Sequence, residues 1–162
     1  MERLWAPWRM RYIDGTHKDE GCIFCNKPKE DRDKDNLIVF RGEYAFAMMN
    51  LFPYTNGHTM VAPYRHTAIF EELTTEEVID IYKVSVLIIR GIKRSMNPEG
   101  FNLGYNLGRT AGAGIADHIH FHIVPRWNGD TNFMPIIGEV KVISEHIEAT
   151  YEKLIKSILE II

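Results

Sequence analysis

Three histidines alternate with apolar residues in the run His118-Ile119-His120-Phe121-His122-Ile123. Successive side chains of an extended strand point to opposite faces, so a strand here places the three imidazoles on one face. Three imidazoles on a buried face would each need a hydrogen-bond partner, which disfavours a role in core packing. Neutral imidazole is a nucleophile and a proton donor or acceptor near pH 7. The pattern therefore favours covalent or acid–base chemistry at this strand.

The same histidines cannot all bind one metal ion on a regular strand. His118 and His122 would lie ~13 Å apart along it, whereas a Zn–N bond is ~2 Å long, so at least one of the three is available for another role.

A second chemical motif is the pair Cys22 and Cys25, separated by two residues. A zinc site would need two further ligands, for which His66 is a candidate, and a pair of buried reduced thiols is the alternative. A redox role is disfavoured because the residues before the pair, 16–21, are polar and turn-like rather than strand-like.

Small residues precede the histidine row, in the segment 111–115. A glycine-rich loop lets backbone N–H groups approach an anion closely, so its position directly before the histidines favours phosphate binding.

The elements that must position these residues follow from periodicity and turn signals. A helix is predicted from Thr74, which has capping-box spacing to Glu77, up to the stop at Asn97-Pro98, with Val78, Ile81, Tyr82, Ser85, Ile88, Ile89 and Ile92 at helical spacing. The segment 26–36 is polar and predicts a solvated loop. Strands are predicted at 37–40, 44–49, 58–62, 101–107 and 118–125, and a terminal helix at 143–162. This order predicts an α+β fold, with a five-stranded antiparallel sheet and two main helices.

Composition restricts the class of protein. The chain has 162 residues, of which 45% are hydrophobic and 25% charged, with a net charge of -3. These values are typical of one globular domain and disfavour a generic nucleic-acid binder. No apolar run approaches the ~18 residues of a membrane span. We expect a cytoplasmic protein with no membrane or nucleic-acid partner, because the start has no secretory pattern and the two cysteines suit a reducing compartment.

The histidine row resembles the signature of the histidine triad (HIT) family of nucleotide hydrolases and transferases. Segment 50–63, with Asn50 and His58, is similar to the branch containing the fragile histidine triad protein. Segments 4–9, 106–109 and 125–133 are similar to bacterial diadenosine tetraphosphate phosphorylases.

The resemblance implies a role for each matching residue. His120 would be the nucleophile that forms a nucleotidyl-histidine intermediate, His122 would contact the α-phosphate, and His58 would be the fourth histidine beside the triad. The implied substrate contacts are Asn50 at the ribose and Asn106, Gly112, Ala113 and Gly114 at the phosphates. Trp127 either stacks on a nucleobase or packs in a core or interface.

The resemblance also implies a structural zinc ion held by Cys22, Cys25, His66 and His118, and a homodimer. No motif for a catalytic metal is visible. The chain is then one HIT domain over 1–162, with an N-terminal segment 1–36, a catalytic core 37–142 and a C-terminal helix 143–162.

These features favour an enzyme that cleaves diadenosine polyphosphates at the α-phosphate, by phosphorolysis. The alternatives are a dinucleotide polyphosphate hydrolase, a nucleotide-binding module without turnover and a zinc-stabilised structural protein. One departure from the family pattern bears on this choice. Many relatives carry Gly-Gln-Ser or Gly-Gln-Thr before the triad, where this chain has Ala113-Gly114-Ile115. The preferred leaving group is therefore left open.

Overall fold

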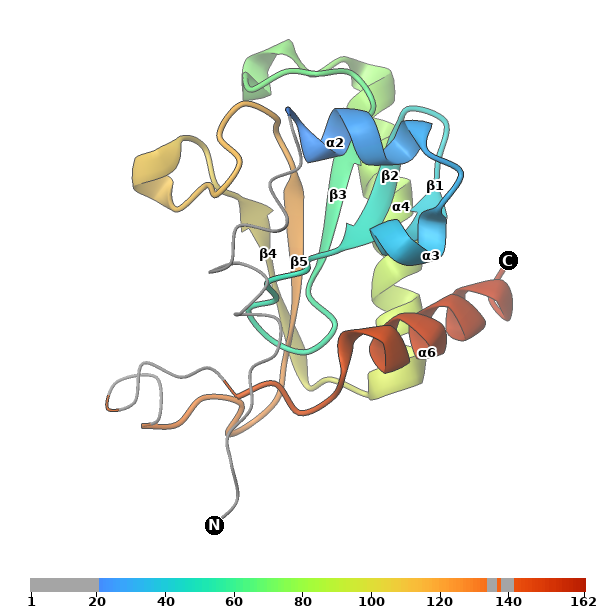
Figure 1. The fold of residues 1–162 in the computed structure, drawn as a ribbon, viewed down its shortest axis with the longest axis vertical. Coiled ribbons are helices and arrows are strands. Elements are labelled where there is room, and N and C mark those ends of the chain that lie inside the picture. Colours follow the sequence, from blue (N-terminus) through green and yellow to red (C-terminus); the bar gives the residue numbers. More distant parts are fainter. Residues whose placement is uncertain (1–20, 134–136, 138–141) are drawn as a thin grey trace.

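Five short apolar segments form one sheet whose strands are all antiparallel and follow the order β1-β2-β3-β5-β4. The computed structural model describes residues 21–133, 137 and 142–162 (Figure 1). The strands are β1 (Ile38–Arg41), β2 (Ala45–Met49), β3 (Thr59–Pro63), β4 (Gly100–Tyr105) and β5 (Phe121–Arg126). The predicted α+β class and five-stranded antiparallel sheet are confirmed.

Helices cover both faces of the sheet. The long helix α4 (Thr75–Met96) packs against β2, β3 and β5, and α6 (Ile147–Leu159) packs on α4. Figure 1 shows α4 behind the sheet and the short helix α2 in front of it. The short helical turns are α2 (Ile23–Asn26), η1 (Lys27–Lys29), α3 (Asp33–Asn36), η2 (Phe70–Glu72) and η3 (Arg109–Ala111).

The capping box predicted for the long helix is present. The Thr74 hydroxyl accepts a hydrogen bond from the Glu77 backbone N–H, and the Glu77 carboxylate accepts one from the Thr74 backbone N–H. The helix ends at Asn97 in the left-handed conformation. The expected apolar face was partly wrong, because Val78 and Tyr82 are exposed. The buried stripe runs instead through Ile81, Val84, Ser85, Ile88, Gly91 and Ile92.

Gly91 lets the two main helices approach each other closely. A Cβ at this position would lie 3.0 Å from the side chains of both Leu154 and Ile158 on α6. The terminal helix is shorter than the predicted 143–162. It begins after His146, which has extended backbone angles, and Thr150 in its first turn donates a hydrogen bond back to the Glu145 carboxylate.

The segment 26–36 is not the simple solvated loop that its polarity predicts. It folds into η1 and α3, and Asn36 is buried, where its amide donates to the Glu30 carboxylate at 2.8 Å. Leu37, with a φ of 58°, ends α3 in the left-handed conformation and turns the chain into β1. A buried polar side chain such as Asn36 stabilises local structure when it has hydrogen-bond partners, and the polarity of the sequence alone does not predict this.

Strand β5 begins at Phe121, three residues later than predicted. The β3–β5 register pairs Val61 with Phe121, so its continuation would pair Pro63 with Ile119. Proline has no N–H to donate, and the Ile119 N–H bonds to the Thr67 carbonyl instead. His118 and His120 therefore precede the strand, and the strand spacing expected between His118 and His122 does not apply.

The sheet has two buried faces with different contents. The inner face packs against α4 and α6 through Val61 and Ile123. The outer face buries Phe46, Met48 and Met60 against Phe24 of α2. The alternation of β5 puts His122 on the outer face, opposite to Ile123. His122, and His120 which stacks on Phe24, therefore lie on the side of the sheet that α2 covers.

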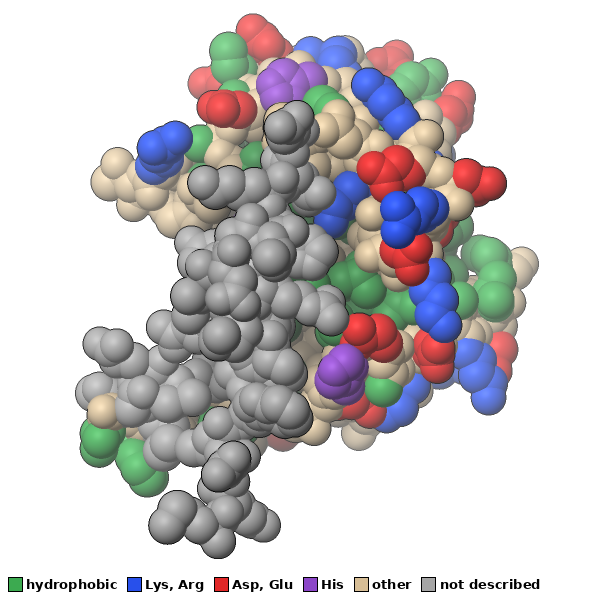
Figure 2. All heavy atoms as spheres, viewed as in Figure 1, with side chains coloured by type: hydrophobic (Ala, Val, Ile, Leu, Met, Phe, Trp, Pro, Cys, Tyr) green, Lys and Arg blue, Asp and Glu red, His purple; other side chains and the backbone are tan. Residues whose placement is uncertain are grey.

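Surface charge is mixed over α3 and α6, where acidic and basic side chains alternate in Figure 2. Lys34 on α3 pairs with Glu152 on α6 at 2.8 Å. In the described parts of the chain, no helix combines the length and apolar character needed to cross a membrane.

Candidate active site and metal centre

The three histidines predicted to be catalytic lie together on the outer face of β3 and β5. His58 directly precedes β3, and its Nε2 lies 2.9 Å from Nδ1 of His122. The His120 ring packs edge-on against His122, with ring centroids 4.7 Å apart. All three side chains are at most 7% exposed. The fold thus brings together His58, His120 and His122, as predicted from their spacing and the family resemblance.

The hydrogen bonds assign the tautomers of His58 and His122. The Tyr54 backbone N–H donates to His58 Nδ1 at 3.0 Å, so His58 carries its proton on Nε2. That proton is donated to His122 Nδ1, which leaves the His122 proton on Nε2. His122 Nε2 lies 3.5 Å from the Asn106 amide nitrogen. The chain of hydrogen bonds from Tyr54 through His58 to His122 therefore leaves a neutral N–H donor at His122 Nε2, close to the Asn106 side chain.

The His120 ring is fixed by the backbone of the residue two positions before it. Its Nδ1–H donates to the His118 carbonyl at 2.9 Å, so the lone pair lies on Nε2. Burial lowers the pKa of His120, although the same hydrogen bond opposes the shift. A neutral imidazole with a free lone pair on a fixed ring is the state that a nucleophile requires.

Burial also keeps His122 uncharged. Desolvation, and next the charge of neighbouring His120, lowers the pKa of His122 from 6.5 to about 4. At neutral pH the site thus offers an N–H donor at His122 rather than a full positive charge.

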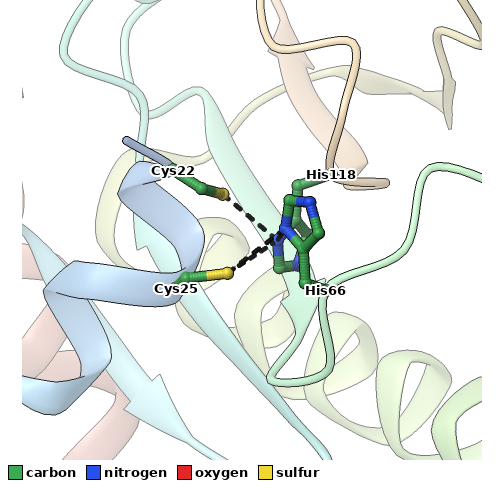
Figure 3. Close-up of side chains that lie close together, drawn as sticks. All are labelled: Cys22, Cys25, His66 and His118. Atoms are coloured by element: carbon green, nitrogen blue, oxygen red, sulfur yellow. Dashed lines mark hydrogen bonds between the residues drawn. The ribbon is translucent and has the colours of Figure 1, made fainter. Parts of the chain in front are cut away.

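A cluster of two thiols and two imidazoles lies at the start of this histidine run. Cys22, which directly precedes α2, and Cys25 on that helix point towards His66 and His118 (Figure 3), and all four ligand atoms lie within 4.8 Å of one another. The Nδ1 atoms of His66 and His118 are 3.2 Å apart, and each is 3.3 Å from one sulfur. A tetrahedron with Zn–N bonds of ~2.0 Å and Zn–S bonds of ~2.3 Å has edges of roughly 3.3–3.8 Å. The four side chains fit a zinc ion in spacing and in chemistry.

The hydrogen bonds around the cluster orient its two histidines. His118 Nε2–H donates to the Pro63 carbonyl at 2.9 Å, which directs the Nδ1 lone pair into the cluster. His66 lies in the connection after β3, where its neighbour Arg65 is bound to the buried Glu77 carboxylate at 2.7 Å. The His118 ring is thus oriented by its own hydrogen bond, and the connection that carries His66 is held by the Arg65–Glu77 pair.

The structure distributes the predicted substrate residues over three places. Asn50, which follows β2, bonds through its amide nitrogen to His58 Nδ1 at 3.4 Å. In the 111–115 loop, Gly112 lies near Asn106, but the N–H groups of Gly112 and Ala113 donate to Arg109 and Gly108 within the loop. Gly114, among the described residues, makes no such bond.

Trp127 stands apart from the other predicted contacts. It follows the last residue of β5, and β5 extends roughly 17 Å from the His120 end to that point. Its side chain is half-buried there. The structure does not bring Trp127 beside the four histidines. The N-terminal motif 4–9 and His17 lie outside the described residues.

Two aromatic residues of the site were missed by sequence reasoning. Phe24 is fully buried and stacks on the His120 ring, with centroids 4.8 Å apart. Tyr54 packs on His58 at 4.3 Å and lies nearly parallel to the His122 ring. Phe24 stands between the two cysteines, so the predicted contact of those thiols with His118 was the signal that could have placed it.

The fold and the site define a class of protein, namely an α+β domain with a cluster of buried histidines beside an antiparallel sheet. A family model for the HIT domain matches residues 31–129. The chain belongs to the HIT domain family, which confirms the resemblance seen in its sequence.

Relatives and solved structures agree with this membership. A protein named AP-4-A phosphorylase from Mycobacterium tuberculosis is 40% identical over 158 residues, which cover 93% of this chain and 80% of that protein. A bis(5'-adenosyl)-triphosphatase from Dictyostelium discoideum is 31% identical over 79% of this chain and 85% of its own length. The crystal structure of a Zn-bound histidine triad family protein from Mycobacterium smegmatis has a TM-score of 0.68 and 25% identity, and the match covers 87% of this chain and 95% of that one.

Proposed function

We propose that this protein is an enzyme that cleaves dinucleoside polyphosphates, such as diadenosine tetraphosphate, at the α-phosphate through a nucleotidyl-His120 intermediate. The observation that carries the proposal is the pairing of two fixed, neutral rings. His120 has its lone pair on Nε2, and His122 has an N–H on Nε2. One ring can attack phosphorus while the other donates to a phosphate oxygen.

The reaction then proceeds in two displacements. His120 Nε2 attacks the α-phosphorus, the bond to the bridging oxygen breaks, and the nucleoside triphosphate leaves with the bonding electrons. Inorganic phosphate attacks the same phosphorus in the second step, which frees His120 and yields a nucleoside diphosphate. Water in place of phosphate would yield the monophosphate. Positioning and charge stabilisation dominate such transfers, and the fixed hydrogen bonds of the site supply them.

Asn50 is proposed to contact the ribose, and Asn106 with the amide of Gly114 to contact the phosphates. The N–H groups of Gly112 and Ala113 would have to exchange their loop partners to take part. Trp127 is proposed to contact a nucleobase at the far end of β5.

Phosphorolysis is favoured over hydrolysis by the similarity to the phosphorylase relative over most of the chain. Hydrolysis is the second candidate, favoured by the triphosphatase relative.

The test is incubation with diadenosine tetraphosphate in the presence and absence of phosphate. Phosphorolysis predicts ADP and ATP only when phosphate is present, and hydrolysis predicts AMP and ATP in both cases. We expect His120→Ala to lower turnover by about 10³-fold or more, because the covalent step is lost. His146→Ala, which removes an exposed histidine of the α6 start, is the matched control and should retain turnover. Tight nucleotide binding without product would favour a non-catalytic module, and full activity of His120→Ala would overturn the mechanism.

We further propose that Cys22, Cys25, His66 and His118 hold a structural zinc ion, which when bound would join α2 to the start of the triad. The proposal is supported by the ligand spacing, by the oriented His118 ring and by the Zn-bound neighbour. Cys22 and Cys25 form no disulfide, which is typical of a reducing compartment, and we propose the cytoplasm as the location.

Metal analysis tests this site without reference to turnover. The purified chain should contain about one zinc per molecule, and Cys22→Ser should lose it and unfold at a lower temperature. His146→Asn serves as the control that keeps its zinc. A chain that carries no stoichiometric zinc after purification from zinc-supplemented medium would contradict the proposal.

We also propose a homodimer, as the family resemblance implies. Support comes from β4, whose only neighbour in the described sheet is β5, and from Leu103 on that strand, which is 51% exposed. An edge strand with exposed apolar side chains is suited to pairing with a second copy.

A further inference from the structure

A groove runs along β4 and β5 on the outer face, beside the histidine site. Its volume is about 380 Å³, within the range of small-molecule sites. It begins at Asn106 and His122 and continues past Asn102 and Val124 to Arg126. From His122 to Arg126 the strand extends roughly 13 Å. The groove is therefore long enough to hold a sizeable part of a substrate whose α-phosphate lies at the histidines.

The strand register explains why the groove has open space beside His122. Gly104 on β4 pairs with His122 on β5, and Asn102 pairs with Val124, so these side chains share the outer face. A Cβ added at Gly104 would meet no atom within 4 Å. The missing side chain at this position is what leaves space directly beside His122.

The groove and the proposed ribose contact lie on opposite sides of the histidines. Asn50 follows β2 and bonds to His58 beside β3, whereas the groove follows β4. The sheet order puts β5, with His122, between these two sides. When a dinucleotide reacts at His120, one half can therefore lie on the Asn50 side and the other half in the groove.

The chemistry of the lining suits a nucleoside better than a bare polyphosphate. The Arg126 guanidinium already forms two bonds with the Asp130 carboxylate, at 2.7 and 2.8 Å, and a third with the Asn102 side-chain oxygen. Its charge is thereby offset. Amide and hydroxyl groups remain to bond a sugar or base, and the half-exposed Tyr54 ring at the groove entrance offers a flat apolar face.

We propose that this groove binds the departing half of the dinucleotide, with its phosphates at the Asn106 end and its nucleoside towards Arg126, and that Gly104 determines whether that half is accommodated. The inference rests on the proposed function, since it concerns the same bond-breaking site. It adds a subsite and a specificity-determining residue to that reaction.

Equilibrium binding to the His120→Ala protein tests the proposal without turnover. Calorimetry compares AMP, which lacks the departing half, with diadenosine tetraphosphate, which has it. We expect the tetraphosphate to bind at least about tenfold more tightly than AMP, and Gly104→Val to reduce that preference by about tenfold or more, because the valine occupies the floor of the groove. Valine is favoured in strands, so the variant should fold.

Gly100→Val is the matched control. Gly100 is on the same strand and the same face, an added Cβ there also meets nothing within 4 Å, and it does not line the groove. It should leave the preference unchanged. Thermal unfolding of both variants monitors their folding.

The possible results separate the two proposals. Binding of neither nucleotide would overturn the proposed function together with the groove. Equal affinities for AMP and the tetraphosphate, or an equal effect of the two valines, would overturn the groove alone and leave the catalytic proposal standing.

Discussion

His118 contacts the thiol cluster through its side chain and His120 through its backbone. Its imidazole points into the thiol cluster, whereas its carbonyl accepts the hydrogen bond that fixes His120. Phe24 on α2 also connects the two sites. It lies between Cys22 and Cys25 in the sequence, and its ring contacts both His118 and His120. The proposed metal centre and the proposed nucleophile are therefore adjacent parts of one packed unit.

The depressed pKa of His122 predicts a specific loss of stability in acid. The folded chain holds this imidazole neutral down to a pKa of about 4, whereas the unfolded chain protonates it near 6.5. The unfolded state therefore binds the extra proton between these values, and stability falls as the pH is lowered from 6.5 to 4. At 1.36 kcal/mol per unit the loss is on the order of 3 kcal/mol.

Chemical denaturation of the unaltered chain and of His122→Asn across this pH range measures the effect. The difference in unfolding free energy between the two should change by up to about 3 kcal/mol from pH 6.5 to pH 4. Parallel curves would show that the titration of His122 is not coupled to folding.

At the residue scale, chemistry was predictable where residue type and spacing suffice. The histidine row and the cysteine pair were visible in the sequence because alternate histidines and closely spaced cysteines are rare patterns. The places of His58 and of His66 with His118 came from the family resemblance. Phe24 and Tyr54 are ordinary aromatic residues, and their role arises only from tertiary contacts. The internal hydrogen bonds of Gly112 and Ala113 were likewise beyond reach, because loop conformation depends on more than glycine content.

At the element scale, the N-terminus of α4 links helix capping to the proposed metal centre. Glu77 closes the capping box with Thr74 and also binds Arg65, next to His66. The Arg65 guanidinium lowers the pKa of the Glu77 carboxyl, which stays ionised at neutral pH.

The Thr74 cap predicts a measurable stability difference between two adjacent threonines. Thr74→Ala should lower the unfolding free energy by about 1 kcal/mol, because the Glu77 backbone N–H loses its acceptor. Thr75→Ala, at an exposed first helical position, should change it by less than about 0.5 kcal/mol. Urea denaturation of both variants gives the comparison, and equal effects would argue against a capping contribution.

Strongly periodic elements were predicted closely, and boundaries set by tertiary contacts were not. The capping box located α4 within one residue of its start. The start of β5 depends on where Pro63 falls in the neighbouring strand, which only the register reveals. The turns in 26–36 depend on the buried side chain of Asn36 bonding to Lys27 and Glu30, which its polarity does not indicate.

At the scale of the whole molecule, the free edge of β4 predicts how a dimer would respond to charge. Leu103→Lys introduces a charge at the proposed interface, and edge lysines oppose strand pairing. Light scattering should show the dimer mass for the unaltered chain and a shift towards monomer for the variant. Leu159→Lys, on an exposed leucine of α6, is the control. A monomeric unaltered chain would contradict the proposed dimer.

The strand order also has a consequence for folding kinetics. β1, β2 and β3 pair in sequence, and β4 pairs with β5, but β5 reaches β3 only across α4 and β4. Pairings of low sequence separation lose less chain entropy on closure, so we expect the three-strand unit and the β4–β5 hairpin to form before they join. His122 meets His58, and His118 meets the cysteines, only at that junction. Refolding chains should therefore recover their circular dichroism signal before they bind zinc, and the last step of folding would be the one that creates the active site.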